Sequence, residues 1–239
     1  MKPSILFFFL FAFMSIAQGQ KTTMKSTQEL SHNVAYSEIA HRKIAINGLS
    51  IFYREAGDPT KETILMLHGF PSSSHMYRDI MKKLAANFHV VAPDYPGFGF
   101  SDAPSIKEYN YTFHEVSLLM DAFVDQLNLT AYYIMMQDYG GPIGFRMAHR
   151  RPEKIKGFIV QNANAYFEGL SGEWAQQYSA MLEAGDAKGV LKMQNWWMSL
   201  EGIKAMYLNG LEDPSIVDPI AYLTDEAFLR REGINEIQI

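Results

Sequence analysis

The segment Met136–Gly141 has the residue types and spacing best suited to chemistry in this sequence. It places Asp138 between an apolar run and two glycines, where a strand would turn sharply into a helix. A carboxylate presented at such a turn can attack a substrate directly, because it is already ionised near neutral pH. The plain alternative is a turn aspartate that caps the helix beginning at Gly140. The segment predicts a nucleophile at Asp138 if its surroundings supply the rest of a site.

A second motif, His68–Pro71, directly follows the apolar run Ile64–Leu67. In a nucleophile-elbow enzyme, a loop in this place gives one amide of the oxyanion hole, and the residue after the nucleophile gives the other. We therefore predict that the backbone N–H groups of Phe70 and Tyr139 form this hole. His68 alone is a weak signal, because a single histidine at a strand end is usually structural.

A third motif, Asp94–Asp102, follows the apolar run Val90–Ala92 and is rich in glycine. Ser101 lies in a stretch that approximates a serine elbow. No strand leads into that stretch, however, and Pro104 follows it closely, which argues against a serine nucleophile there. The glycines also lack the spacing of a dinucleotide-binding loop, so the motif is interpreted as a turn.

Alternating strands and helices are predicted to position these motifs. Two alternating runs flank Asn47 and Gly48, a dipeptide that favours a tight hairpin turn. The elements that follow are expected in this order: strand Ile64–Leu67, a helix with Met76, Ile80 and Leu84 on one face, strand Val90–Ala92, a helix beginning with a capping box at Thr112, strand Tyr132–Met136, helix Gly140–Arg150 and strand Phe158–Val160. This pattern predicts an α/β fold with a mostly parallel sheet and helices on both faces.

Together, the three motifs resemble the branch of the α/β-hydrolase fold family that contains epoxide hydrolases and haloalkane dehalogenases. The resemblance covers residues 39–164 well and the rest only loosely. It implies that Asp138 attacks a substrate carbon to form an alkyl-enzyme ester, which a histidine-activated water then hydrolyses. It also implies a small apolar substrate and no metal or organic cofactor.

Two residues depart from the pattern of this branch. Tyr139 stands where both families usually carry tryptophan, and Phe70 replaces the asparagine or glutamate of many dehalogenases. Neither change leaves an obvious side-chain donor for a leaving halide. An epoxide hydrolase-like activity is therefore preferred, with a dehalogenase-like or another α/β-hydrolase activity as the alternative. The resemblance implies that cap tyrosines donate to the epoxide oxygen, and the following are available: Tyr166, Tyr178, Tyr207 and Tyr222.

The composition changes after Asn164, where aromatic residues fall among methionine and leucine at helical spacing. We expect a helical cap over residues 165–239. Its tentative substrate-lining residues are Trp174, Tyr178, Trp196 and Trp197. An aromatic stripe at this spacing is as often ordinary core, so that alternative stays open.

The resemblance also requires an acid and a histidine after the nucleophile, in that chain order. The sole later histidine, His149, lies eleven residues along the helix from Asp138, at roughly 16 Å given 1.5 Å per residue. We expect the last strands of the sheet, the acid and the base to be missing and the cap to be incomplete, as in a fragment of a longer hydrolase. The alternative from another class is a truncated, non-catalytic remnant.

The N-terminal residues follow the pattern of an export signal. A basic residue, an apolar run over Ile5–Phe13 and small residues before Gln20 predict a signal peptide over residues 1–19. A polar linker over residues 20–38 would follow, and the mature chain would be periplasmic or secreted, without stable membrane insertion. The net charge of −5 gives no basic face for nucleic acid, and the chain has no cysteine for disulfides or thiolate sites. Composition does not predict an oligomeric state.

Overall fold

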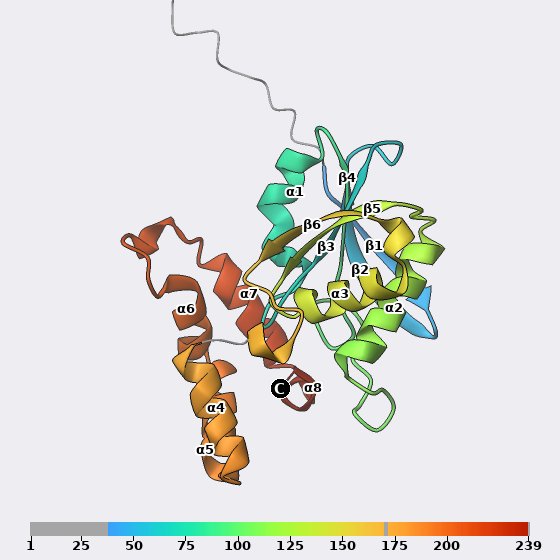
Figure 1. Ribbon diagram of the computed structural model, residues 1–239. Coiled ribbons are helices and arrows are strands. Elements are labelled where there is room, and N and C mark those ends of the chain that lie inside the picture. Colours follow the sequence, from blue (N-terminus) through green and yellow to red (C-terminus); the bar gives the residue numbers. More distant parts are fainter. Residues whose placement is uncertain (1–37, 170–171, 239) are drawn as a thin grey trace, which may run out of the picture. The chain divides into compact units, whose positions relative to one another are not determined.

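The computed structural model describes residues 38–169 and 172–238 (Figure 1). The predicted signal peptide and all but the last residue of the predicted linker lie outside these residues. Within the described part of the chain, no helix is long and apolar enough to cross a membrane.

The described chain begins with the predicted hairpin. Strands β1 (Ala40–Ile46) and β2 (Leu49–Ala56) pair antiparallel, and Ile46 lies opposite Leu49 across a two-residue loop. Asn47 and Gly48 in this loop have φ angles of 50° and 85°. Positive φ at both positions is the requirement of a type I′ turn, which matches the right-handed twist of the strands.

The strands form one six-stranded sheet in the order β1-β2-β4-β3-β5-β6. Strand β2 is antiparallel to β4, whereas β3 pairs in parallel with β4 and β5, and β5 pairs in parallel with β6. The remaining strands span Thr63–Leu67 (β3), His89–Pro93 (β4), Tyr132–Gln137 (β5) and Ile155–Gln161 (β6). The mostly parallel sheet predicted from the sequence is therefore confirmed.

Helices pack on both faces of the sheet (Figure 1). One face packs against α2 (Phe113–Gln126) and α3 (Gly140–Arg150), and the other packs against α1 (Arg78–Leu84). The predicted capping box forms at the start of α2, where the Thr112 hydroxyl accepts a hydrogen bond from the Glu115 N–H at 3.1 Å.

The prediction for the buried face of α1 is wrong at one position. Ile80 is 37% exposed, whereas the adjacent Met81 is fully buried. A short 3-10 helix, Ser74–Tyr77, precedes α1. Because a 3-10 helix has three residues per turn rather than 3.6, it rotates the face that the following α-helix presents to the sheet.

Five α-helices follow the sheet in the described part of the chain. They are α4 (Glu173–Glu183), α5 (Ala187–Trp197), α6 (Leu200–Leu208), α7 (Ile220–Leu229) and α8 (Ile234–Gln238), with short 3-10 helices at Phe167–Gly169 and Pro214–Ile216. A further 3-10 helix, Pro152–Lys154, lies between α3 and β6. Helices α4 and α5 pack side by side (Figure 1). Helices α6 to α8 contribute Ile203, Leu229 and Ile234 to a buried apolar cluster against which Phe70 packs.

Strand β6 is the edge of the described sheet and is paired on one side by β5. Its apolar residues Phe158, Ile159 and Val160 are 45%, 44% and 48% exposed. Three consecutive exposed apolar residues face both sides of the sheet, because successive side chains of a strand alternate in direction.

Candidate active site

Asp138 lies between the end of β5 and the start of α3, and its φ angle is 50°. This left-handed conformation is uncommon for any residue except glycine, although aspartate and asparagine adopt it more readily than most. The backbone around it is hydrogen-bonded. The Asp138 N–H donates to the Asn162 carbonyl at 3.2 Å, and the Gly141 N–H donates to the Asp138 carbonyl at 2.9 Å. These bonds hold the strained turn that the sequence predicted.

The turn needs two glycines because neighbouring chain segments approach very closely. A Cβ atom at Gly69 would lie 2.4 Å from the Cβ of Asp138, and one at Gly140 would lie 2.2 Å from the Leu67 carbonyl oxygen. Both distances are far inside van der Waals contact. The loop after β3 can therefore reach the Asp138 carboxylate only because these positions carry no side chain.

The three residues predicted to form the reaction centre lie together. The Phe70 N–H donates to Asp138 Oδ1 at 2.7 Å. Burial raises the pKa of the Asp138 carboxyl, while hydrogen bonds from the backbone N–H groups of Phe70 and Tyr139 oppose that rise. Two backbone donors thus point at a partly desolvated carboxylate, where a negative oxygen is stabilised more strongly than in water.

The Tyr139 side chain is enclosed by aromatic rings and does not face an open site. Its ring centroid lies 5.9 Å from that of Phe70, 6.4 Å from that of Phe98 and 4.9 Å from that of Phe113. Its hydroxyl donates to the Gln238 carbonyl of α8 at 3.2 Å. The Tyr139 hydroxyl is therefore occupied by the backbone and is not directed at the Asp138 carboxylate.

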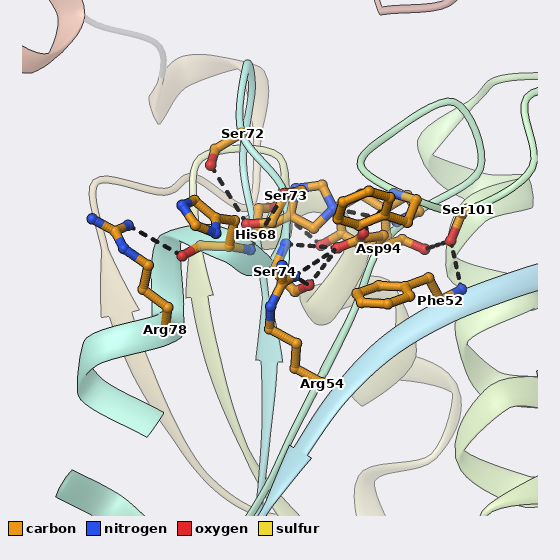
Figure 2. Close-up of polar contacts among 12 residues, drawn as sticks. Phe52, Arg54, His68, Ser72, Ser73, Ser74, Arg78, Asp94 and Ser101 are labelled. Atoms are coloured by element: carbon orange, nitrogen blue, oxygen red, sulfur yellow. Dashed lines mark hydrogen bonds and ion pairs between the residues drawn. The ribbon is translucent and has the colours of Figure 1, made fainter. Parts of the chain in front are cut away.

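A buried polar network holds together the loops that follow β3 and β4 (Figure 2). Asp94 is fully buried and accepts from the Ser74 N–H at 2.7 Å and from the Phe100 N–H at 2.9 Å. The guanidinium of Arg54, also buried, donates to the Ser74 hydroxyl and lies 3.9 Å from Asp94 Oδ1. Burial raises the pKa of Asp94, and these donors and Arg54 oppose that rise. The motif Asp94–Asp102 is thus the anchor of the two loops.

His68 is a buried, neutral part of this scaffold. Its Nε2 accepts from the Tyr95 N–H at 3.2 Å, so the ring proton lies on Nδ1, which is 3.2 Å from the Gly69 carbonyl. Its ring stacks on that of Tyr95 with centroids 4.0 Å apart. Burial lowers the pKa of His68 to about 3. Both nitrogens are engaged by the backbone, which leaves neither for activating a water molecule.

His149 lies at the far end of α3 and is exposed to solvent. The helix that begins beside Asp138 carries it away from the carboxylate, as the sequence indicated. Among the described residues, no group of three or more histidines or carboxylates could hold a metal ion.

The tentative substrate-lining residues lie in different environments. The Trp174 side chain is outside the described residues. Trp196 is exposed, whereas the Trp197 ring lies 5.3 Å from that of Tyr178. The pKa of Tyr139 is raised mainly by burial and further by electrostatic interaction with Asp138 and then with Tyr178. Tyr178 is therefore the predicted lining residue that interacts electrostatically with Tyr139.

The other three cap tyrosines also differ in their surroundings. Tyr166 is 77% exposed. Tyr207 packs in the apolar cluster with Phe70, and its hydroxyl donates to Asp225 at 2.6 Å. The half-buried Tyr222 has its ring centroid 6.3 Å from that of Tyr207. Of these three tyrosines, Tyr207 is thus the one whose hydroxyl donates to a buried carboxylate.

Sequence reasoning missed the contributions of Asn162, Asp225 and Gln238. Besides accepting from Tyr139, Gln238 donates from its side chain to the Gly97 carbonyl at 2.7 Å. None of the three belongs to a motif. The sequence offered one signal, which was Asp225 itself within the apolar run of α7. A charge buried at such a position needs a partner.

Comparison with known proteins shows the family of this chain. Residues 62–220 match the family described as alpha/beta hydrolase fold. An uncharacterised hydrolase of Saccharomyces cerevisiae is 36% identical over 202 residues, which cover 83% of this chain and 69% of the yeast protein.

A haloalkane dehalogenase of Bradyrhizobium diazoefficiens is 38% identical over 120 residues, or 50% of this chain, and the match spans 38% of the dehalogenase. The solved structure of the epoxide hydrolase CorEH superposes with a TM-score of 0.68 at 19% identity, covering 84% of this chain and 71% of that one. The likeness to CorEH is a likeness of fold.

Proposed function

Because this chain belongs to the α/β-hydrolase fold family and is a hydrolase of that superfamily, we propose that it acts through an ester formed on Asp138. The observation that carries the proposal is the pair of backbone donors at this carboxylate. The Phe70 N–H binds Oδ1 at 2.7 Å, and the Tyr139 N–H also stabilises the carboxylate. With Oδ1 held in this way, Oδ2 is the oxygen that attacks.

In the first step, Asp138 Oδ2 attacks a substrate carbon and the bond from that carbon to its leaving atom breaks. For an epoxide, the leaving atom stays attached as an alkoxide that takes up a proton. In the second step, water attacks Cγ of the ester and loses a proton to solvent, and negative charge develops on Oδ1. The Phe70 N–H, which holds Oδ1 in the free protein, is thus in place for the charge that forms in the second step. The Cγ–Oδ2 bond then breaks, which releases the alcohol and restores the carboxylate. Because neither His68 nor His149 can take up the proton of the attacking water, this step is slow.

An epoxide is the preferred substrate class. The Tyr139 hydroxyl donates to a backbone carbonyl, and Phe70 has no polar side chain, so neither holds a halide. A ring-opened epoxide keeps its oxygen and needs a proton, which a nearby hydroxyl can supply. Among the predicted lining residues, Tyr178 interacts electrostatically with Tyr139, the residue after the nucleophile. We assign small apolar epoxides on this basis.

Dehalogenation is the second candidate. It is favoured by one specific observation, the 38% identity to a haloalkane dehalogenase over half of this chain. The first step is the same for both substrates, since a carboxylate displaces halide or opens an epoxide by attack at carbon.

The test is covalent labelling of Asp138. We expect styrene oxide to leave a stable mass adduct on the peptide that contains Asp138, because His68 and His149 are both unable to activate water in the described structure. A chloroalkane incubated in parallel should label more slowly if epoxides are the better substrates. Adduct mass and site are read by peptide mass spectrometry.

Asp138→Asn is the decisive variant, since asparagine tolerates the left-handed conformation but is a far weaker nucleophile. It should abolish labelling. Asp79→Asn, an exposed site on α1, is the matched control and should leave labelling unchanged. Labelling that persists in Asp138→Asn would contradict the proposal. Repeated turnover by the 239-residue chain would contradict only the expectation that the ester is stable.

A further inference from the structure

A buried carboxylate that the proposed reaction does not use lies behind the loop that carries Phe70. Asp225, in the middle of α7, is fully buried, and its Oδ2 accepts from the Tyr207 hydroxyl of α6 at 2.6 Å. Its other oxygen, Oδ1, is buried without a hydrogen-bond partner among the described residues. A buried carboxylate oxygen without a partner is costly, so a nearby donor is expected.

The neighbouring donor is the Ser72 hydroxyl, on the loop after β3 (Figure 2). Ser72 is buried, and a side-chain hydrogen bond from it opposes the rise that burial causes in the pKa of both Asp225 and Tyr207. Its hydrogen bond to the Ser73 carbonyl is long, at 3.5 Å. A hydroxyl rotates freely, so Ser72 can serve as a donor to this pair.

The same loop is tied to the helices by apolar contact as well. Phe70, two residues before Ser72, packs in the cluster formed by Ile203, Leu229 and Ile234 of α6 to α8. Between the cluster and the nucleophile, Gly69 abuts Asp138 so closely that no side chain fits. Phe70 thus joins the cluster to the nucleophile, with its ring against Ile203, Leu229 and Ile234 and its N–H 2.7 Å from Asp138 Oδ1.

We propose that Asp225 is a positioning residue: with Tyr207 and Ser72 it fixes the loop of the Phe70 N–H donor against α6 and α7. This inference rests on the proposed function, because it assigns Asp225 a role in the reactivity of Asp138. Hydrogen-bond donors to a reacting oxygen are effective only within a narrow range of distance and angle. Misplacement by about 1 Å can cost on the order of 100-fold in rate.

Labelling kinetics test the proposal. The rate of adduct formation by styrene oxide, measured against its concentration, gives a limiting rate constant and a half-saturating concentration. Asp225→Ala should lower the limiting rate constant by about 10-fold or more, with little change in half-saturation. Asp225→Asn should restore most of the rate, because its amide oxygen still accepts from Tyr207. Tyr207→Phe, which keeps the ring in the cluster, should reproduce part of the loss.

Glu226→Ala is the matched control. Glu226 is the next residue of α7 and pairs with Arg230 near the surface, so its loss should leave both constants unchanged. Full activity in Asp225→Ala would overturn the proposal. Equal losses in Asp225→Ala and Asp225→Asn, or a change confined to half-saturation, would overturn it too.

Hydrogen exchange separates this proposal from the proposed function. Asp225→Ala should speed amide exchange in the peptide spanning residues 68–76, whereas Asp225→Asn should not. If the wild-type chain forms no adduct but this exchange pattern holds, the aspartyl-ester function fails and Asp225 still holds the loop. If the adduct forms but exchange and limiting rate are unchanged in Asp225→Ala, the role of Asp225 fails alone.

Discussion

At the scale of single residues, Asp138 combines backbone strain with a desolvated charge. Its φ of 50° belongs to the left-handed region, and burial raises the pKa of its carboxyl. Neither condition helps an isolated turn to form. Both are held by the surrounding sheet and loops, which is the usual way in which strain persists at a functional site. The strain aims the carboxylate at the Phe70 and Tyr139 amides.

This strain predicts an inverted order of stability for two truncations of Asp138. Asp138→Gly should be more stable than Asp138→Ala by about 1 kcal/mol, since alanine is disfavoured at positive φ. The free energy of unfolding from urea titration measures the difference. The same pair at Asp79, within the exposed surface of α1, should show the opposite order by about 1 kcal/mol, because alanine is the better helix former. Equal stability at position 138 would show that the turn is unstrained.

At the scale of elements, the loop after β3 is held from two sides. On one side, the Arg54–Ser74–Asp94 network joins it to the loop after β4. On the other side, α6 and α7 contact it through the Phe70 cluster and through Asp225. These helices are therefore part of the support of the site as well as part of the predicted cap.

The burial of Asp225 predicts a pH-dependent contribution to stability. Burial raises the pKa of Asp225 to about 6, against an ordinary value of 3.8, while Tyr207, Ser72 and Arg78 oppose the rise. The folded chain thus holds this proton more tightly than the unfolded chain does. Its stabilising effect is complete below pH 3.8 and is lost as the pH rises through about 6. Two pKa units correspond to about 2–3 kcal/mol.

Asp225→Asn should remove this component. Between pH 4 and pH 7, the free energy of unfolding of the wild type should fall by about 2–3 kcal/mol relative to that of the variant. Urea titrations across this range measure the difference. A constant difference between the two proteins over the whole range would contradict the prediction.

At the scale of the whole molecule, the sheet of the described chain ends at β6 with apolar residues exposed on both faces. An exposed edge strand offers unpaired N–H and C=O groups to another chain. The exposed apolar side chains of β6 also favour association, because burying them against another chain removes apolar surface from water.

We predict that the 239-residue chain self-associates through β6. Ile159→Lys should lower light scattering and shift the chain toward the monomer on size-exclusion chromatography, because a charge on an edge strand opposes strand pairing. Leu191→Lys, at an exposed position of α5, is the matched control and should change association little. If both substitutions act equally, general solubility explains the effect and the edge does not.

The sequence by itself determined the features that depend on neighbouring residues. The hairpin turn at Asn47 and Gly48, the elbow at Asp138 and the N–H donors of Phe70 and Tyr139 follow from local patterns and from the order of motifs. Residue type alone predicts these turns, since a tight turn requires residues that tolerate positive φ. The predicted fold followed because alternating strands and helices have few ways to pack.

The tertiary structure decided the contacts that join distant segments. The sequence gives no local sign that Gln238 reaches Gly97 and Tyr139, or that Asp225 faces Tyr207 and Ser72. It also does not show that Ile80 turns outward. These outcomes depend on how whole helices pack, which is set by the summed burial of many side chains rather than by any short pattern.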